Sequence, residues 1–337
     1  MRSRAKRLIV AAGVAYAAFL LGFLLLRSTP LREMWFLRLA ADFRPFLFTP
    51  LVALVPAVLV CARSRVAKVF VASPCLVFAL LYGPLFLPPT PVASSSSERV
   101  LSVMTYNVTR GDPGLDSILA IMENEGADVV ALQEVTFEVA QALSELSGTY
   151  PHVALHPTPN GYDGCGVLSR YPIIDEEAFP LVEGAHLYQR VVLDVEGERV
   201  HLLNMHFQPP RLAVMRRGLP IPLPVGYDTT IQDRELERLL SELDAVEGKV
   251  LVVGDLNMTD ESPGYAEVTG RLVDAYRVAG WGLGHTFPDR EVRSIPMPFP
   301  LIRIDYIFLS SELTTNRAYV GDRGGPDHRF LGAELSF

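Results

Sequence analysis

Three long apolar runs within the first 87 residues constrain this chain more than any other feature. The run at 8–26 has no charged side chain, and those at 46–62 and 69–87 have none either but contain two prolines each. A helix needs about 20 mostly apolar residues to cross the hydrocarbon core of a bilayer, with a usual range of about 17–25. Proline is better tolerated in such helices than in soluble ones. The sequence therefore predicts an all-α transmembrane region of about three helices within residues 1–88.

These runs have two alternative explanations. A cleaved signal peptide would account for 8–26, but the run is long, lacks an Ala-x-Ala end and is followed by further apolar runs. A buried helical hairpin of a soluble fold is disfavoured because the chain becomes polar only after the third run. We therefore expect an integral membrane protein.

Basic residues indicate how this region is oriented. They cluster at 2–7, before the first run, and at 63–68, between the second and third. Both clusters would face the cytoplasm under the positive-inside rule. Four arginines at 27, 32, 38 and 44 weaken the bias. We expect an integral protein of the cell membrane or inner membrane. Its N-terminus would lie in the cytoplasm, and the part of the chain after the apolar runs would lie on the extracytoplasmic side.

The chain after the apolar runs has a different character. A Pro/Ser-rich stretch at 89–99 is typical of a linker. Residues 1–94 contain eleven Lys/Arg and two Asp/Glu, whereas the remaining 243 contain 19 and 36, a formal net charge of −17. Proteins that follow duplex nucleic acid usually carry a basic face. This acidic balance is more typical of a soluble, self-repelling surface.

Residues 100–337 alternate between helical and strand patterns. The run at 249–255 is almost continuous Val and Leu, which predicts a strand buried on both faces. Glu196-Gly197-Glu198 between two apolar segments predicts a hairpin. Further strands are predicted at 101–108, 128–135, 164–169, 190–195, 199–206, 303–309 and 330–337, and helices at 116–125, 137–146 and 229–246. This mixture predicts a layered α/β domain.

Polar residues recur where these predicted strands end. They are Asn107, Glu134, His206, Asp255 with Asn257, Asp305 within the run at 303–309, and Asp327-His328 before the last strand. Ligands tend to bind at strand ends of layered α/β folds. Singly, most have an ordinary explanation as caps or turns. Asp305 does not, because a carboxylate inside an apolar strand needs a partner. Oxygen ligands such as Glu134 and Asn107 suit a hard cation such as Mg²⁺.

Taken together and in order, these motifs resemble the endonuclease/exonuclease/phosphatase superfamily. The resemblance covers about Leu101 to Phe337 and rests on Tyr106-Asn107, Gln133-Glu134, His206, Gly254-Asp255-Leu256-Asn257, Arg303-Ile304-Asp305-Tyr306 and Asp327-His328. It implies a four-layer α/β sandwich, in which two packed mixed sheets are flanked by helices, and a hydrolase that acts on phosphate esters. Mg²⁺ is the implied cofactor, with Mn²⁺ as a second candidate.

The resemblance also implies roles for individual residues. Glu134 would be the main metal ligand, with Asn107 beside it and Asp327 as a further carboxylate. Asp255 would orient or deprotonate the attacking water, and Asn257 would hold the phosphate. His328, oriented by Asp305, would contact the scissile phosphate, with His206 as second imidazole. Tyr162 and Arg170 are candidate substrate contacts, whereas His152, His156, His186, His201 and His285 match no motif and are expected to be structural.

Family resemblance does not give the substrate. The favoured reading is a membrane-anchored phosphoesterase that acts on a phosphodiester or phosphomonoester in a lipid head group, a small molecule or a nucleic acid. An anchored nuclease of DNA or RNA is one alternative, and a non-catalytic binding module on the same fold is another. The sequence indicates no protein partner.

Overall fold

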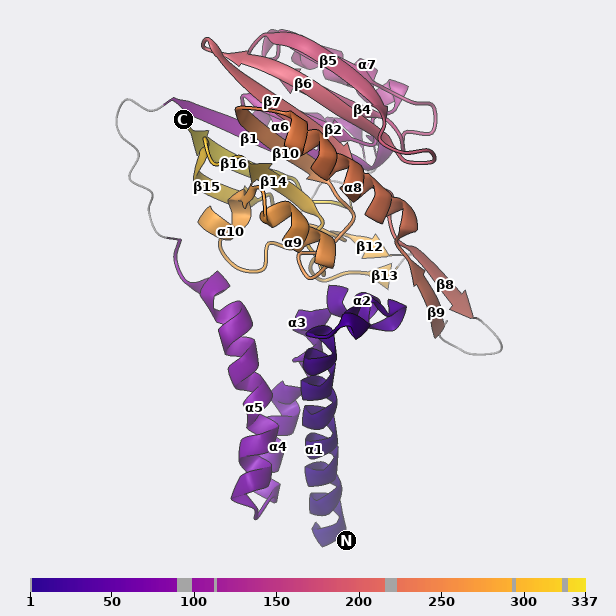
Figure 1. The fold of residues 1–337 in the computed structure, drawn as a ribbon, viewed down its shortest axis with the longest axis vertical. Helices are drawn as coiled ribbons and strands as arrows, with labels where there is room; N and C mark the ends of the chain where they lie inside the picture. The colour runs from indigo at the N-terminus through magenta and orange to yellow at the C-terminus, as the bar shows by residue number, and fades with distance from the viewer. Residues whose placement is uncertain (1, 90–98, 112–113, 216–222, 293–294, 323–326) are drawn as a thin grey trace. The chain divides into compact units, whose positions relative to one another are not determined.

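The computed structural model describes residues 2–89, 99–111, 114–215, 223–292, 295–322 and 327–337. The chain divides into two compact units. The N-terminal unit comprises Met1–Leu87 and Leu212–Asp228, and the C-terminal unit comprises Pro88–Arg211 and Thr229–Phe337 (Figure 1). Residues 90–98 of the predicted linker at 89–99 lie outside the described residues.

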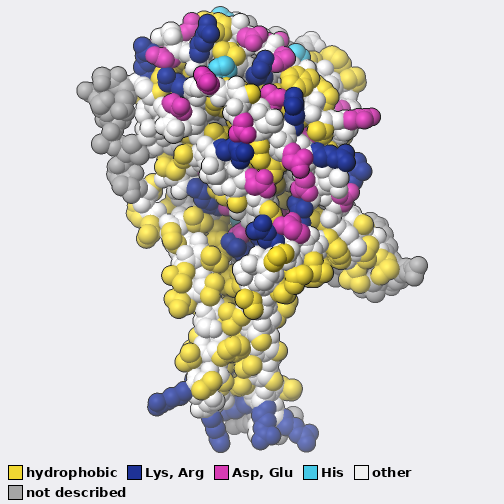
Figure 2. Space-filling model, viewed as in Figure 1, with side chains coloured by type: hydrophobic (Ala, Val, Ile, Leu, Met, Phe, Trp, Pro, Cys, Tyr) yellow, Lys and Arg dark blue, Asp and Glu magenta, His cyan; other side chains and the backbone are white. Residues whose placement is uncertain are grey.

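Apolar helices make up most of the N-terminal unit. Among the described residues, three helical segments are long and apolar enough to cross a membrane: Ser3–Arg27, Arg44–Cys61 and Arg65–Phe86. They consist of α1 (Arg2–Arg27), α3 (Arg44–Leu47) with α4 (Leu51–Cys61), and α5 (Arg65–Tyr82) with η2 (Gly83–Phe86). Less than a quarter of each apolar window is buried. Figure 2 accordingly shows hydrophobic side chains over the surface of these helices.

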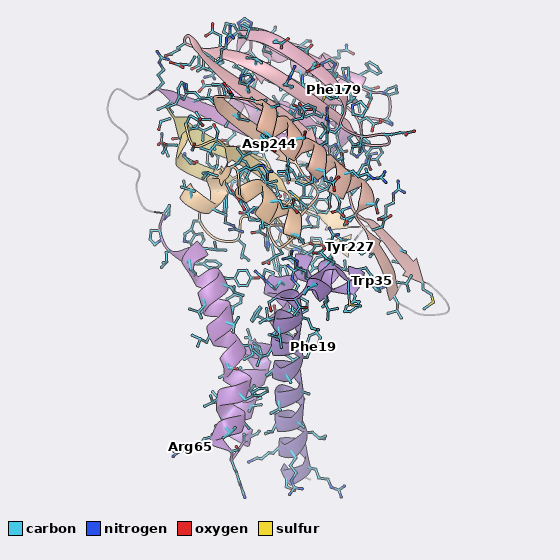
Figure 3. All side chains as sticks on the ribbon, viewed as in Figure 1. Phe19, Trp35, Arg65, Phe179, Tyr227 and Asp244 are labelled. Carbon is cyan, nitrogen blue, oxygen red and sulfur yellow. The ribbon has the colours of Figure 1, made fainter. Side chains whose placement is uncertain are left out.

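The three segments pack on one another through a small core. Ala17, Val58 and Val71 are buried where α1, α4 and α5 meet. Gly13 allows the close approach of α4, because a Cβ atom there would lie 2.6 Å from a methyl group of Val58. The N-terminus of α1 and Arg65 at the start of α5 lie at the same end of this bundle (Figures 1 and 3). Two of the basic clusters in the sequence are thus on one side of the helices.

Shorter elements complete the N-terminal unit. The one-turn helix η1 (Pro30–Glu33) and α2 (Trp35–Asp42) follow α1. The hairpin strands β8 (Arg211–Met215) and β9 (Leu223–Asp228) come from far along the chain, and β9 packs on α2. The Tyr227 hydroxyl donates to Asp42 Oδ2 at 2.5 Å. The sequence did not predict this hairpin or its place with the N-terminal helices.

Two six-stranded sheets form the centre of the C-terminal unit. The first has the order β15-β16-β1-β2-β4-β3 and the second β11-β14-β10-β7-β6-β5. Strands of the first sheet are β1 (Val100–Asn107), β2 (Val129–Gln133), β3 (His152–His156), β4 (Cys165–Ser169), β15 (Thr314–Val320) and β16 (Leu331–Ser336). Strands of the second are β5 (Ile173–Pro180), β6 (Leu187–Val195), β7 (Glu198–His206), β10 (Lys249–Asp255), β11 (Val273–Asp274) and β14 (Asp305–Leu309). Both sheets mix parallel and antiparallel pairs.

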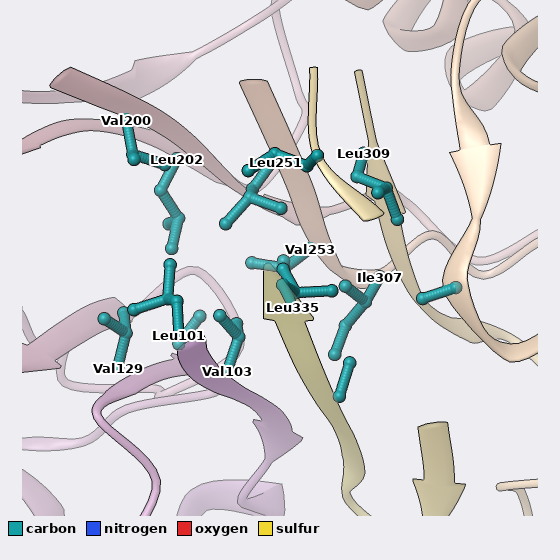
Figure 4. Close-up of a cluster of buried hydrophobic side chains, with 14 of the residues drawn as sticks. Leu101, Val103, Val129, Val200, Leu202, Leu251, Val253, Ile307, Leu309 and Leu335 are labelled. Atoms are coloured by element: carbon teal, nitrogen blue, oxygen red, sulfur yellow. The ribbon is translucent and has the colours of Figure 1, made fainter. Parts of the chain in front are cut away.

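The main core lies between the two sheets. Alternate residues of β1, such as Leu101 and Val103, face alternate residues of the other sheet, such as Leu202, Leu251 and Val253 (Figure 4). Helices cover the two outer faces: α6 (Leu115–Glu125) and α7 (Phe137–Leu143) on the first sheet, and α8 (Thr230–Ala245) and α9 (Pro263–Thr269) on the second. This is the four-layer α/β sandwich that the sequence predicted, and its fold class is confirmed.

Several predicted boundaries need correction. The strand predicted at 303–309 begins at Asp305, so this residue is its first member and not an interior one. The helix predicted at 137–146 ends at Leu143 and continues as the 3₁₀-helix η4 (Ser144–Gly148). The short elements α10 (Ala275–Ala279), β12 (Glu291–Val292) and β13 (Ile295–Pro296) were not predicted.

Candidate active site

Three candidate residues occupy one row of the second sheet. Asp255, the last residue of β10, pairs with Asp305 at the start of β14 and with His206 at the end of β7. Paired strands lie about 4.7–4.9 Å apart, so the register alone places these side chains side by side. The row forms because the parallel strands β7 and β10 end, and the antiparallel strand β14 begins, at the same end of the sheet.

Glycine at position 254 permits the close approach of β10 and β7. Its φ is +130°, and a Cβ atom would lie only 2.0 Å from the carbonyl oxygen of Met205. Any other side chain would force the strands apart next to Asp255. Asn257 has a left-handed backbone with φ of 48°, which asparagine tolerates better than most residues. Backbone geometry at the end of β10 thus accounts for Gly254 and Asn257 in this motif.

The Oδ2 atom of Asp255 lies at the centre of the site. It is 3.8 Å from Nε2 of His206 and 3.6 Å from Nε2 of His328. The amide nitrogen Nδ2 of Asn107 donates to it at 3.2 Å, and that of Asn257 at 3.3 Å. Asp255 is almost fully buried, and these groups are its polar neighbours at Oδ2 among the described residues.

His328 is held by a carboxylate on its other side. Its Nδ1 lies 3.0 Å from Oδ2 of Asp305, and the ring contacts that of Phe287. Burial lowers the pKa of His328, but the carboxylates of Asp305 and Asp255 outweigh burial and raise it to about 10. The imidazole is therefore cationic at neutral pH, which suits contact with a phosphoryl oxygen.

In two members of the row, Asp255 and His206, the pKa shift instead favours the uncharged form. Burial raises the pKa of Asp255, nearby Asp305 adds to the rise and His328 opposes it, giving about 8. Burial lowers the pKa of His206 well below its ordinary value, and His186 and His328 lower it further. The site therefore contains one cationic and one neutral imidazole on either side of a carboxyl group whose proton affinity is high.

The first sheet contributes Asn107 and Glu134. Asn107 ends β1, and Glu134 follows β2 with a strained φ of 60°. A buried bond joins the two sheets beneath them, because the amide of Gln133 donates to Oδ1 of Asn204 at 2.7 Å. Glu134 Oε1 lies 4.0 Å from Nε2 of His206. Side chains from both sheets thus converge on one site.

Two amides, those of Asn107 and Asn257, bond protein groups at the site. Asn107 accepts from the Thr109 backbone N–H through Oδ1 and turns Nδ2 toward Glu134 and Asp255. In this orientation Nδ2 bonds both carboxylates, and the one hydrogen bond to Oδ1 leaves that oxygen a second lone pair. Asn257 donates its Nδ2 to the carbonyl of Phe207 and to Asp255. Since both N–H groups have protein acceptors, Asn257 here orients Asp255 and has no spare donor for phosphate.

The oxygen donors near Glu134 fit a hard divalent cation. Glu134 Oε2 is buried and accepts no hydrogen bond from the described residues, and burial raises the pKa of Glu134. Arg110 Nε lies 3.5 Å from this atom. Asp327 adds electrostatically to the rise, which places a second carboxylate nearby. A carboxylate atom that is buried without a bonded donor is the kind of ligand that Mg²⁺ or Mn²⁺ binds.

A second grouping of ligand atoms is less suitable for a metal. Atoms of Asp255, Asp305 and His328 lie within 4.8 Å of one another, and all three are buried. However, His328 already bonds Asp305 through Nδ1 and carries a raised pKa. A protonated imidazole has no lone pair for a metal. These three residues are better arranged for proton and charge handling than for coordination.

The two predicted substrate contacts separate in the structure. Tyr162 is exposed, and its ring stacks under the Arg110 guanidinium at 4.3 Å, next to Glu134. Arg170 instead pairs with Asp128 at 3.1 Å. Ser169 aligns with Val129, at the start of β2, whereas Glu134 follows the end of that strand. Arg170 therefore lies at the far end of the sheet, and we do not retain it as a substrate contact.

Three residues near the site were missed by the sequence reasoning. Thr109 hydrogen-bonds Asp327, and Arg110 contacts Glu134. His186 was expected to be structural, yet its ring stacks on His206 with centroids 4.2 Å apart and an angle of 8°. Its Nδ1 lies 2.9 Å from Oδ1 of Asp163. Nothing in the local pattern marks these residues, because they lie in loops between the predicted strands.

Comparison with known proteins gives matches at the level of family and fold. A family model described as the endonuclease/exonuclease/phosphatase family matches residues 104–333. The uncharacterized protein YbhP of Escherichia coli strain K12 is 27% identical over 185 residues, which are 52% of this chain and 64% of YbhP. The match thus spans slightly less than two thirds of that relative's length.

Solved structures share the fold at low sequence identity. An endonuclease/exonuclease/phosphatase from Bacteroides vulgatus has a TM-score of 0.55 and 17% identity, and the match covers 70% of this chain and 98% of that one. TDP2 of D. rerio, complexed with a single strand DNA product, has a TM-score of 0.55 and 16% identity, with 71% and 99% covered. At this identity the likeness shows the sandwich fold alone.

Proposed function

Because the chain belongs to the endonuclease/exonuclease/phosphatase family, we propose that it is a membrane-anchored, divalent-metal-dependent hydrolase of phosphate esters. One observation carries the proposal: Oδ2 of Asp255 lies within 4 Å of imidazole nitrogens of both His206 and His328. In such an arrangement the buried carboxylate can remove a proton, and the cationic imidazole of His328 can stabilise the negative charge that develops.

The side chains suggest how the reaction proceeds. Asp255 accepts the proton of a water molecule that attacks phosphorus in line with the leaving group. His328, held in place by Asp305, donates to a phosphoryl oxygen and offsets the charge that develops there. His206, at the end of β7, lies beside Asp255 on the side away from His328. Asn107 and Asn257 fix the orientation of Asp255 by donating hydrogen bonds to it. Glu134 and Asp327 would hold Mg²⁺ or Mn²⁺, which supplies Lewis-acid stabilisation of the phosphoryl group.

The helices of the N-terminal unit support anchoring in a membrane. Three helical segments of sufficient length and apolar character are mostly unburied within the protein. The basic clusters at the start of α1 and around Arg65 share one end of the bundle, which is the cytoplasmic end under the positive-inside rule. Three crossings then place the chain after α5 on the opposite side. The helices accordingly anchor the protein in the cell membrane or inner membrane, and the catalytic domain lies on the extracytoplasmic side.

Two properties limit the substrate class: the acidic net charge of the catalytic part and its location beside a membrane. A lipid head group, a phosphorylated small molecule or an external nucleic acid would each reach an anchored, outward-facing site. The net charge of −17 on the residues after 94 disfavours duplex nucleic acid. TDP2 is a structural neighbour that was seen with a DNA product, but its 16% identity supports no more than the fold. A nuclease would be recognised by DNA affinity that falls steeply with salt.

The test uses the full-length protein in detergent. Hydrolysis of a generic aryl phosphodiester and monoester is followed with Mg²⁺, with Mn²⁺ and after chelation, for the native protein and for His328→Ala, Glu134→Gln and a surface control, Glu145→Gln. We expect turnover that needs the cation, is lost in His328→Ala, and needs more Mg²⁺ in Glu134→Gln. A folded protein without turnover on any phosphate ester would favour the binding-module alternative.

A further inference from the structure

We propose that α2 and the β8–β9 hairpin together form a lipid-facing surface that lies in the headgroup region of the bilayer. This surface, called the interfacial surface below, consists of Trp35–Asp42 and the described hairpin residues 211–215 and 223–228. The proposal rests on the membrane anchoring proposed above. Its partner is a phospholipid bilayer, and specifically the one that the helices of the same unit cross.

Chain length keeps α2 at the edge of the membrane. α1 ends at Arg27, and the next segment that can cross a membrane begins at Arg44. Only residues 28–43 lie between them, and the chain must turn back within this stretch. The eight residues of α2 span about 12 Å, so the connection cannot extend far from the bilayer boundary.

The composition of α2 suits that location. Leu37 and Ala41 are buried against the protein, while Phe36 and the preceding Met34 are exposed. A short helix with large exposed apolar side chains beside two membrane crossings is the pattern of an interfacial helix. Trp35 begins this helix (Figure 3). Tryptophan and tyrosine are enriched at the level of the headgroups.

The hairpin is joined to α2. β9 packs on α2, and the Tyr227 hydroxyl donates to Asp42 Oδ2 at 2.5 Å. Figure 3 shows Trp35 and Tyr227 in the same part of this unit. If α2 lies at the headgroups, a strand that packs on it lies within about 10–12 Å of them, one helix diameter.

The described strand residues of the hairpin are mostly apolar, and several of them are exposed. Between Arg211 and Asp228, the described strand residues carry no charge. Three of them, Leu212, Leu223 and Val225, are 45%, 48% and 48% exposed. An isolated two-stranded ribbon is at best marginally stable in water, and contiguous exposed apolar side chains indicate a binding surface. Lipid acyl chains next to the headgroups would cover these side chains.

The consequence concerns the attachment of the catalytic domain. The hairpin is inserted between β7, which ends at His206, and α8. Phe207, the next residue, accepts a hydrogen bond from Asn257. The two units are therefore connected by the chain in more than one place. One connection is the linker before β1, and another is the hairpin, which joins the C-terminal unit close in sequence to His206.

Tryptophan fluorescence in vesicles of phosphatidylcholine with brominated acyl chains tests the proposal on the full-length protein. Bromine quenches only indoles that reach the acyl region. Trp281→Phe leaves Trp35 as the reporter for α2. Leu212→Trp and Val225→Trp, each combined with Trp35→Phe and Trp281→Phe, report on the hairpin. Ile174→Trp in the same background is the matched control, since Ile174 is 50% exposed but precedes the acidic run Asp175-Glu176-Glu177.

We expect Trp35 and at least one hairpin indole to lose roughly half of their emission relative to unbrominated vesicles, consistent with burial about 5–10 Å into the headgroup boundary. The Ile174→Trp control should retain its emission. Quenching of Trp35 without quenching at either hairpin position would overturn the proposal while leaving membrane anchoring intact. Extraction of the protein by alkaline carbonate, together with an unquenched Trp35, would instead overturn the anchoring itself and the inference with it.

Discussion

His328 and Asp305 form a buried pair in which Nδ1 of the imidazole lies 3.0 Å from Oδ2 of the carboxylate. The carboxylate fixes the ring so that Nε2 points at Asp255, 3.6 Å away. We predict that Asp305→Asn lowers kcat by about 10²–10⁴-fold, because the amide cannot stabilise the imidazolium. KM should change little. Steady-state kinetics check this, with the exposed Asp322→Asn as control, and an unchanged kcat would contradict the assignment.

The pKa values at the site predict a bell-shaped pH dependence. Asp255 must be ionised to accept a proton, and its pKa is raised to about 8. His328 must stay protonated, and its pKa is raised to about 10. Hence kcat/KM should rise with pH up to about 8 and fall above about 10. A bound divalent cation favours the carboxylate and shifts the lower limb to lower pH.

The measurement is kcat/KM against pH at several Mg²⁺ concentrations. The lower limb should move with Mg²⁺, and the upper limb should not. If kcat/KM instead fell steadily between about pH 6 and about pH 9, Asp255 could not be the base and His328 could not be the protonated donor to the phosphoryl oxygen.

His186 is predicted to position His206. The two rings are stacked at 4.2 Å, and Asp163 holds His186 from the other side at 2.9 Å. His186→Ala should lower kcat by about 10- to 100-fold, since small displacements of a reacting group are costly. His186→Phe keeps a flat ring and should restore most of the loss. His201→Ala, away from the site motifs, serves as control, and equal losses in the Ala and Phe variants would argue against stacking as the cause.

Glu235 predicts a pH dependence of stability that is separate from catalysis. It is buried on α8 and accepts from the Gln208 N–H at 2.8 Å, and burial raises its pKa from 4.5 to about 8. The folded protein then holds a proton that the unfolded chain releases. The free energy of unfolding should fall as pH rises from about 4.5 to about 8, with a slope of up to about 1.4 kcal/mol per pH unit.

Glu235→Gln should remove this component. Denaturation of the detergent-solubilised protein across that pH range measures it, and the exposed Glu237→Gln on the same helix is the control. An identical slope in the native protein and in Glu235→Gln would show that Glu235 ionises normally.

The sequence predicted the second sheet well where its strands are buried. β10 is apolar between Lys249 and Asp255, so its boundaries and the polar residue at its end were evident. β3 and β5 were missed because they lie at sheet edges and carry polar or charged residues, including Asp175-Glu176-Glu177. The β8–β9 hairpin was also missed, and its strand β9 contains Pro224, a residue that edge strands tolerate but that weakens a strand pattern.

The site was predicted as a set of residues but not as a set of contacts. Order along the chain identified Asp255, Asp305 and His328, because each stands at a strand end or beside one. Their partners depend on which strands become neighbours, which no local pattern reveals. The orientation of Asn107 and the stacking of His186 on His206 depend on bonds between segments far apart in sequence.

The row formed by His206, Asp255 and Asp305 has a consequence for insertions and deletions. A shift of one residue within any of the three strands would turn its functional side chain to the other face of the sheet. Length changes in β7, β10 or β14 are therefore incompatible with the site, whereas length changes in the connections after them leave the row intact. The hairpin between His206 and α8 is such an extension. Related chains are free to diversify in these connections while the three strands keep a fixed length.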